Sequence, residues 1–254
     1  MRKSNPRKVI QRLTPKIVCI NRATTSLDIS FGTLIRALQS YVDDHVAPVW
    51  GTPAKLVKGS NFEKGAWAVV FLDNADQVTG RGTKLADHDL TPEGLPLAKV
   101  FVSTAILNGE FVSVAASHEL VEMLVDPAIN MMATGPHSAG LGKSNVMYAY
   151  ESADPVEELS FKVKGVPMCN FVYPTYFEAY HKPNSIQFDH MKKIARPFQI
   201  LSGGYQIMFK GGKWSALHGS PKKKKALERE DRRGHRSEAR IRGGARRRLG
   251  SQGV

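Results

Sequence analysis

The segment VAASHELVEMLVDP (residues 114–127) places a histidine and two carboxylates within five positions. On an α-helix, residues four apart lie on one face with Cβ atoms roughly 5–6 Å apart, so His118 and Glu122 can hold one cation from a single element. Glu119 lies about 100° further around the helix, where a carboxylate can reach a metal-bound water without binding the ion. The neighbouring valines and leucines predict that the helix is at least half buried, and Pro127 ends it.

The spacing alone leaves a second interpretation open. In it, the helix has a polar stripe on which His118 pairs with Glu122 and binds no metal. Asp126 is a weak candidate ligand, because it lies about 12 Å along the helix axis from His118. We expect Asp126 to cap or brace the site instead.

A resemblance to a known family favours the metal site. His118-Glu119-x-x-Glu122 resembles the HExxH helix of zincin metallopeptidases, with a glutamate in place of the second histidine. More specifically, SHELVEMLVDP is similar to the SHExxExxxDP signature of a group of zincin-like proteins, many of them encoded by bacteriophages and bacteria. In that group an ExxDP motif follows, which here is Glu151 to Pro155. The phrases GVPMCNFVYPTYF and RPFQILSGGYQIM (165–177 and 196–208) also resemble that group, and the similarity spans about residues 17–217.

The resemblance implies an α+β fold, a single zincin-like domain with a mixed sheet and a metal-site helix. It implies a zinc ion held by His118, Glu122 and a third ligand from the later motif. Glu151 and Asp154 are both candidates for that ligand, with the other carboxylate orienting His118. A catalytic zinc site has three protein ligands and an open position for water.

The activity implied is that of a zinc metallopeptidase, in which Glu119 activates the metal-bound water. Tyr173, Tyr176 and His181 are candidates for stabilising the oxyanion. The carboxylate at position 122 makes the site more anionic and broadens the choice of metal towards Mn, Ca or Mg. A site that holds a metal for stability without hydrolysis therefore stays open, and whether the protein is an enzyme is left undecided.

Charge divides the chain into three regions. The formal net charge is +13, of which residues 1–16 carry +6 and residues 218–254 carry +9, leaving −2 for residues 17–217. We expect a basic N-terminal arm, one domain over 17–217 and a basic, disordered C-terminal tail. The tail offers nonspecific, salt-sensitive contacts to DNA or to acidic capsid surfaces, through Lys222, Lys223, Lys224, Lys225, Arg246, Arg247 and Arg248.

Two kinds of protein fit this organisation best, because the nearly neutral body argues against a third, a plain nucleic-acid-binding protein. The first is a metal-dependent hydrolase acting on a peptide substrate. The second is a phage virion or assembly protein that keeps the zincin-like fold and contacts DNA or other virion proteins through its basic ends. Residues 1–16 are not followed by a long apolar stretch, so we expect no secretory signal and a location in the host cytoplasm or the virion. The chain has no run of eighteen apolar residues, which predicts no membrane span, and two cysteines cannot form a disulfide scaffold.

Hydrophobic periodicity predicts alternating helices and strands. Apolar residues at helical spacing predict a helix from Phe31 to Val49 with Ser30 as its N-cap. The Gly- and Asp-rich stretch 73–94 reads as a connection in which Asp87, His88 and Asp89 form a solvated turn. Residues 111–126 are expected to be helical and 128–145 to form a loop. Strands are predicted at 16–20, 66–72, 99–104, 146–151, 160–163 and 204–209.

Overall fold

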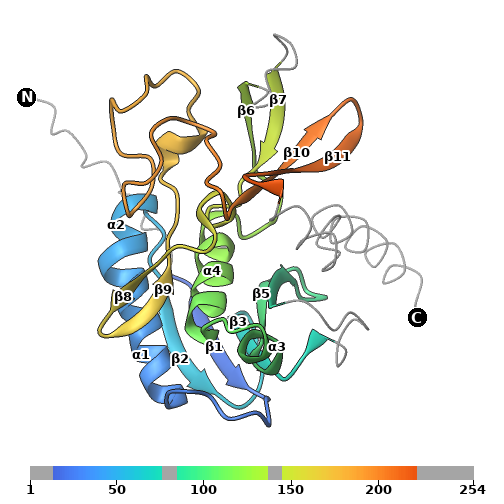
Figure 1. The fold of residues 1–254 in the computed structure, drawn as a ribbon. Coiled ribbons are helices and arrows are strands. Elements are labelled where there is room, and N and C mark those ends of the chain that lie inside the picture. The colour runs from blue at the N-terminus through green and yellow to red at the C-terminus, as the bar shows by residue number, and fades with distance from the viewer. Residues whose placement is uncertain (1–13, 76–84, 137–144, 222–254) are drawn as a thin grey trace, which may run out of the picture.

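The computed structural model describes residues 14–75, 85–136 and 145–221. Within these residues, five strands form a sheet in the lower half of Figure 1, in the order β2-β1-β3-β5-β4. The first four of these strands run parallel, and β4 pairs antiparallel with β5 at the edge. The strands are β1 (Lys16–Asn21), β2 (Lys55–Gly59), β3 (Trp67–Leu72), β4 (Ala86–Leu90) and β5 (Pro96–Phe101).

The centre of this sheet follows from continuous apolar runs. KIVCIN in β1 and WAVVFL in β3 are buried on both faces of the sheet, as central parallel strands require. The strands predicted at 16–20 and 66–72 are confirmed. The strand predicted at 99–104 is only partly right, because β5 ends at Phe101. Beyond it, Ser103 and Thr104 donate their N–H groups to the carbonyl of Asp73, and Val102 starts the short helix α3 (Val102–Leu107).

A long helical segment lies against the sheet. It consists of α1 (Phe31–Tyr41), the π-helical turn η1 (Val42–Val46) and α2 (Ala47–Trp50), which follow one another without a break over 20 residues. As predicted, Ser30 is the N-cap: its Oγ accepts from the N–H of Thr33 at 3.1 Å. Gly51, with φ of 66°, ends the segment in the left-handed conformation.

The motif-bearing segment forms helix α4 (Val112–Val125), which confirms the helix predicted over 111–126. It packs against β4, β5, β9 (Val166–Cys169) and α1. Figure 1 shows α4 in the middle of the molecule, between the sheet and the later strands. Leu120, Val121 and Leu124 are buried in the main hydrophobic core, together with residues of α1 and the sheet. The helix that carries the motif is therefore held on several sides.

The later part of the chain builds a second core and two smaller sheets. In the described residues, one has the order β11-β10-β7-β6 and the other pairs β8 with β9. The elements are β6 (Met132–Pro136), β7 (Asn145–Ala149), η3 (Asp154–Val156), β8 (Ser160–Val163), η4 (Pro174–Phe177), β10 (Tyr205–Lys210) and β11 (Lys213–His218). The strands predicted at 146–151, 160–163 and 204–209 correspond to β7, β8 and β10.

The loop predicted over 128–145 is wrong at its centre. β6 pairs antiparallel with β7, from Met132 opposite Ala149 to Pro136 opposite Asn145. In its sequence, MATGP, only Thr134 favours a strand, while Gly135 and Pro136 disfavour one, so the pairing rather than local propensity makes it a strand. Tyr148 and Phe198 pack together beneath this sheet, with ring centroids 4.9 Å apart.

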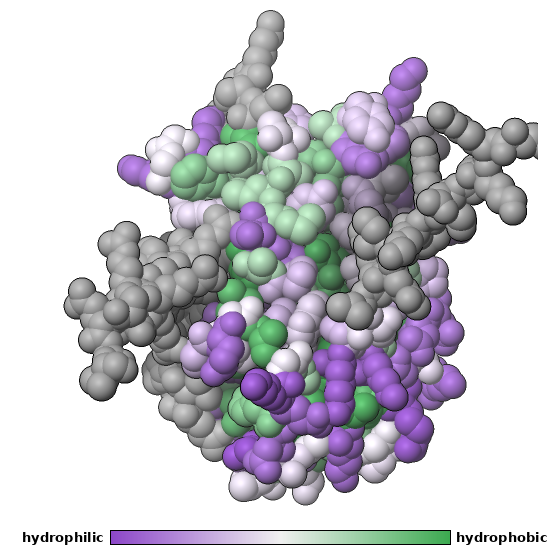
Figure 2. Space-filling view, turned by 180° about the vertical axis from the view of Figure 1, so that it is seen from behind, coloured by the Kyte–Doolittle hydropathy of each residue, from purple (hydrophilic) through white to green (hydrophobic). Residues whose placement is uncertain are grey.

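The view from behind shows how polarity is distributed over that face. In Figure 2, hydrophilic side chains gather over the lower part, at the level of the five-stranded sheet in Figure 1, and apolar side chains reach the surface higher up. At the level of fold class, the structure is a mixed α/β arrangement with a mixed sheet and a motif-bearing helix. The regions 1–13 and 222–254, which hold most of the basic side chains of the two ends, lie outside the described residues.

Candidate metal centre

Helix α4 is buried nearly all round, and this makes its acidic residues unusual. Only Val114 and His118 of its fourteen residues are more than marginally exposed. The side chains of Glu119 and Glu122 are only 10% and 4% exposed. Because a buried carboxylate is costly unless it is paired or binds a cation, these two glutamates need partners from other elements.

The first group of partners joins α4 to η3. Nε2 of His118 lies 3.5 Å from Oε2 of Glu122 and 3.2 Å from Oδ1 of Asp154. These three residues offer one ligand atom each within 4.8 Å of one another, a grouping able to hold a metal ion. The structure thus brings Asp154 to the face on which the sequence places His118 and Glu122.

The second group contains a histidine that the sequence interpretation set aside. His88, Glu122 and Glu151 also offer ligand atoms within 4.8 Å of one another. Nδ1 of His88 is 3.6 Å from Oε2 of Glu122, and Nε2 of His88 is 3.7 Å from Oε2 of Glu151. The structure therefore brings both candidate acids of the later motif to the cluster, each beside a different histidine.

The prediction of a solvated turn at residues 87–89 is wrong, because these residues lie in β4. Side chains alternate between the two sides of a strand. Asp87 pairs with Lys99 of β5, at 3.2 Å, whereas His88 reaches α4. The only signal in the sequence for a strand here was Lys99, which can pair with Asp87 and Asp89 on either side of His88. That signal is too weak to identify an edge strand.

His88 also contacts the proposed general base. Its Nδ1 lies 2.8 Å from Oε2 of Glu119, and with Glu119 ionised the imidazole is the donor. This hydrogen bond joins β4 to α4. It fixes the position of Glu119 beside the first group of ligands.

A backbone hydrogen bond fixes the later acidic motif relative to α4. The N–H of Ala153 donates to Oε1 of Glu122 at 3.1 Å, which ties the segment carrying Glu151 and Asp154 to α4. The carboxylate of Asp126, expected to cap or brace the site, accepts the N–H groups of Asn130 and Met131 at 3.0 and 2.9 Å. The turn after α4 is thereby fixed.

The carboxylates of the cluster raise the pKa of both its histidines. Burial lowers the pKa of His88, but its hydrogen bond to Glu119 and the charges of Glu151 and Glu122 outweigh this and raise it to about 10. The pKa of His118 is likewise raised well above its usual value, because Glu122 and Asp154 overcome the effect of burial. The cluster thus attracts protons to its histidines.

The carboxylates respond to the same crowding. Burial raises the pKa of Glu122, and the charge of Glu151 adds to this while His118 opposes it. The pKa of Asp154 is raised well above its usual value by burial and by Glu122. Burial and mutual repulsion therefore make the negative charge of these carboxylates costly, and a bound divalent cation would offset that cost.

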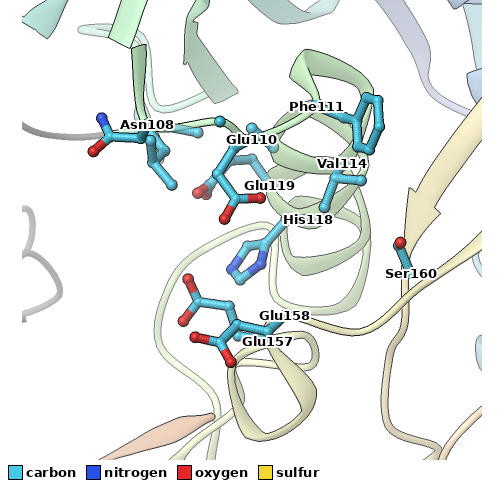
Figure 3. A pocket seen from close by; sticks show the side chains of 13 residues that line it. Asn108, Glu110, Phe111, Val114, His118, Glu119, Glu157, Glu158 and Ser160 are labelled. Carbon is cyan, nitrogen blue, oxygen red and sulfur yellow. The ribbon is translucent and has the colours of Figure 1, made fainter. Parts of the chain in front are cut away.

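A pocket of about 380 Å³ opens beside the first group. In Figure 3, His118 points from α4 into this space, with Glu110 and Glu119 on one side of its ring and Glu157 and Glu158 on the other. Phe111 and Val114 supply an apolar wall. A ligand in this pocket would meet His118 and Glu119 directly.

The candidates for oxyanion stabilisation lie in different surroundings. The hydroxyl of Tyr173 contacts Nδ1 of His190 at 3.2 Å, and Nε2 of His181 contacts Oε2 of Glu178 at 2.6 Å. Tyr176 is fully buried, and burial together with the charges of Tyr148 and Asp154 raises its pKa. Among the three, only Tyr176 is electrostatically linked to a residue of the cluster in the described part of the chain.

The expected nucleic-acid contacts at residues 222–225 and 246–248 lie outside the described residues. In the part of the chain that the structure describes, no helix has both the length and the apolar character needed to cross a membrane.

The structure thus supplies buried His/Glu/Asp groups that could hold a metal ion. No family model, no curated protein and no solved structure matches this chain, so the zincin-like resemblance of its sequence stays a prediction.

Proposed function

We propose that the protein is a metal-dependent hydrolase, with zinc as the cation and a peptide as the substrate, and that its domain is zincin-like. The observation that carries the proposal is the convergence of His118, Glu122 and Asp154, of which His118 also lines a pocket. Their donor set fits a divalent cation, because imidazole nitrogen and carboxylate oxygen are both zinc ligands. The distances of 3.2 and 3.5 Å from Nε2 of His118 to the two carboxylates suit ligands around one ion.

A cation bound by these residues would lower the pKa of a coordinated water towards about 7 and polarise a substrate carbonyl. The residues of the chain supply the rest. Glu119 accepts the proton of the attacking water and passes it to the leaving amine. His88 keeps the carboxylate of Glu119 in position through the 2.8 Å contact. The apolar wall around Phe111 and Val114 receives the side chains of the substrate.

The test uses the purified full chain and a mixture of fluorescence-quenched peptides of varied sequence. Glu119→Gln keeps the size of the side chain and removes its basicity. We expect hydrolysis to fall by about 10²–10⁴-fold with unchanged metal content. Glu63→Gln, at an exposed glutamate paired with Lys16, is the matched control and should keep the activity. Unchanged hydrolysis by Glu119→Gln would remove Glu119 from the mechanism, and no hydrolysis by the metal-loaded wild type would reject the function.

A further inference from the structure

The two ligand groups share Glu122, so the number of metal ions that the cluster can hold depends on whether this residue serves both groups at once. We infer that the cluster binds two divalent cations, one at His118, Glu122 and Asp154 and one at His88, Glu122 and Glu151, with Glu122 between them. The inference rests on the metal site proposed above and extends it to a two-metal centre. Each group, taken alone, offers ligand atoms within 4.8 Å of one another.

The position of Glu122 suits a bridge. Its Oε2 lies 3.5 Å from Nε2 of His118 and 3.6 Å from Nδ1 of His88, so one oxygen faces both imidazoles. Its Oε1 is held by the N–H of Ala153. Zinc–ligand distances of about 2.0–2.2 Å place two ligands of one ion no more than about 4.4 Å apart. The contacts of Nε2 of His118 with Glu122 and Asp154, at 3.5 and 3.2 Å, and of Nε2 of His88 with Glu151, at 3.7 Å, fall within this limit.

One ring nitrogen of His88 makes no hydrogen bond within the described residues. Its side chain is only 8% exposed, and its Nε2 has no hydrogen-bond partner in the described part of the chain. The other ring nitrogen, Nδ1, contacts Glu119 at 2.8 Å. A histidine that donates one N–H to a carboxylate and turns its other nitrogen towards an ion is the usual arrangement of a metal ligand. Oε2 of Glu151, at 3.7 Å from Nε2, supplies the neighbouring ligand.

The charge balance favours two cations over one. Four carboxylates meet at the cluster, all with side chains no more than 10% exposed: Glu119, Glu122, Glu151 and Asp154. With all four ionised, a single divalent cation and two neutral imidazoles would leave a net charge of −2 away from water. Two divalent cations bring the sum to zero, which removes the cost of burying unbalanced charge.

The donor set also indicates the class of metal. Three carboxylates and two imidazoles are an oxygen-rich combination, which suits Mn²⁺ as well as Zn²⁺. Two ions in hydrolytic sites are commonly 3.5–4 Å apart and clamp both the attacking and the leaving oxygen. Mn²⁺ is therefore a suitable probe, since two coupled Mn²⁺ ions have an electron paramagnetic resonance spectrum distinct from that of isolated ions.

The test strips the full chain with chelator, reloads it with Mn²⁺, removes unbound metal and measures both metal per chain and the spectrum. We expect two Mn²⁺ ions per chain and a coupled spectrum. His88→Ala should reduce the content to one ion with an uncoupled six-line spectrum, whereas His181→Ala, a histidine paired with Glu178, should keep two. Circular dichroism checks folding, and Glu151→Gln serves as the second variant if His88→Ala does not fold.

The outcomes separate the inference from the proposed hydrolase. One ion per wild-type chain with an uncoupled spectrum overturns the two-metal centre, even if the protein hydrolyses peptides. Two coupled ions without hydrolysis reject the hydrolase and support the centre. The absence of bound metal at saturating Mn²⁺ and Zn²⁺ overturns both.

Discussion

Nδ1 of His88 lies 2.8 Å from Oε2 of Glu119, although the two residues come from an edge strand and a central helix. This contact connects Glu119, the neighbour of His118 in α4, with His88 of the second ligand group. Glu119 is therefore held from outside its own helix, and the positions of β4 and α4 are coupled at the centre of the site.

The shared carboxylate of Glu122 should decide whether added metal stabilises the protein. Glu122→Gln removes the charge and keeps the shape. In chelator we expect the free energy of unfolding to change by less than about 1 kcal/mol, because lost attraction to His118 is offset by relief of repulsion with Glu151. A hundredfold excess of metal over its Kd stabilises a protein by about 2.7 kcal/mol, which raises Tm by roughly 5–10 °C.

We expect the wild type to show this rise and Glu122→Gln to lose it, measured by thermal unfolding with and without Zn²⁺. Glu63→Gln makes the same substitution at an exposed glutamate paired with Lys16 and should behave as wild type. A full Tm rise in Glu122→Gln would contradict the role of this residue.

Substitution of Gly204 should disturb the metal site, because this residue lies against the backbone that carries Asp154. A Cβ atom at Gly204 would come within 2.3 Å of the carbonyl oxygen of Pro155 and 2.8 Å of that of Asp154. Gly204→Ala must therefore displace this segment. We expect a loss of about 1–3 kcal/mol in stability and weaker metal binding, measured by urea unfolding and metal titration.

The control for this prediction is Gly32→Ala in α1, where the added Cβ meets only Nη1 of Arg36, at 3.5 Å. That variant should keep or slightly increase stability and leave metal binding unchanged. If Gly204→Ala also left both quantities unchanged, the segment at Asp154 would be free to shift without harm to the site.

Asp73 should make the stability of the fold depend on pH. Its carboxylate accepts the N–H groups of Thr24 and Thr25 at 3.0 and 2.8 Å and the hydroxyl of Thr24 at 2.7 Å. These hydrogen bonds lower the pKa of Asp73. Because the folded pKa lies below the unfolded value of about 3.9, this stabilisation is complete above that value and is lost as the pH falls through the folded pKa.

Asp73→Asn should cost about 1–3 kcal/mol at pH 7 and should weaken the fall in stability between pH 5 and pH 3. Urea unfolding at pH 7, 5 and 3.5 measures both effects. The exposed Asp28→Asn variant should retain the acid dependence of the wild type. Identical pH profiles for wild type and Asp73→Asn would show that another group is responsible.

Ser117 should be required to hold β9 against α4. Its side chain is fully buried, and its Oγ accepts the N–H of Cys169 at 2.8 Å and donates to the carbonyl of Val114 at 3.0 Å. Ser117→Ala leaves the amide of Cys169 without this acceptor. We expect a loss of about 1–3 kcal/mol by urea unfolding. The exposed Ser26→Ala variant should change stability by less than about 0.5 kcal/mol, and an equally small change in Ser117→Ala would contradict the bracing role.

Local features of the chain could be predicted where the sequence itself encodes them. Continuous apolar residues predicted β1 and β3, and Ser30 predicted the start of α1, because its hydroxyl can accept an N–H of the first helical turn. Elements that depend on distant partners were missed. β4 and β6 have little apolar pattern of their own, and each is a strand because a neighbouring strand supplies its hydrogen bonds.

The sequence by itself determined that His118 and Glu122 share a helical face, because the i to i+4 hydrogen bonds of a helix fix that spacing within a few residues. Only the tertiary structure decided that Asp154, Glu151 and His88 join them. His88 precedes Glu119 by 31 residues and reaches it because β4 pairs with β5 beside α4. Such convergence comes from burial and strand pairing between distant segments, which no local pattern of residues records.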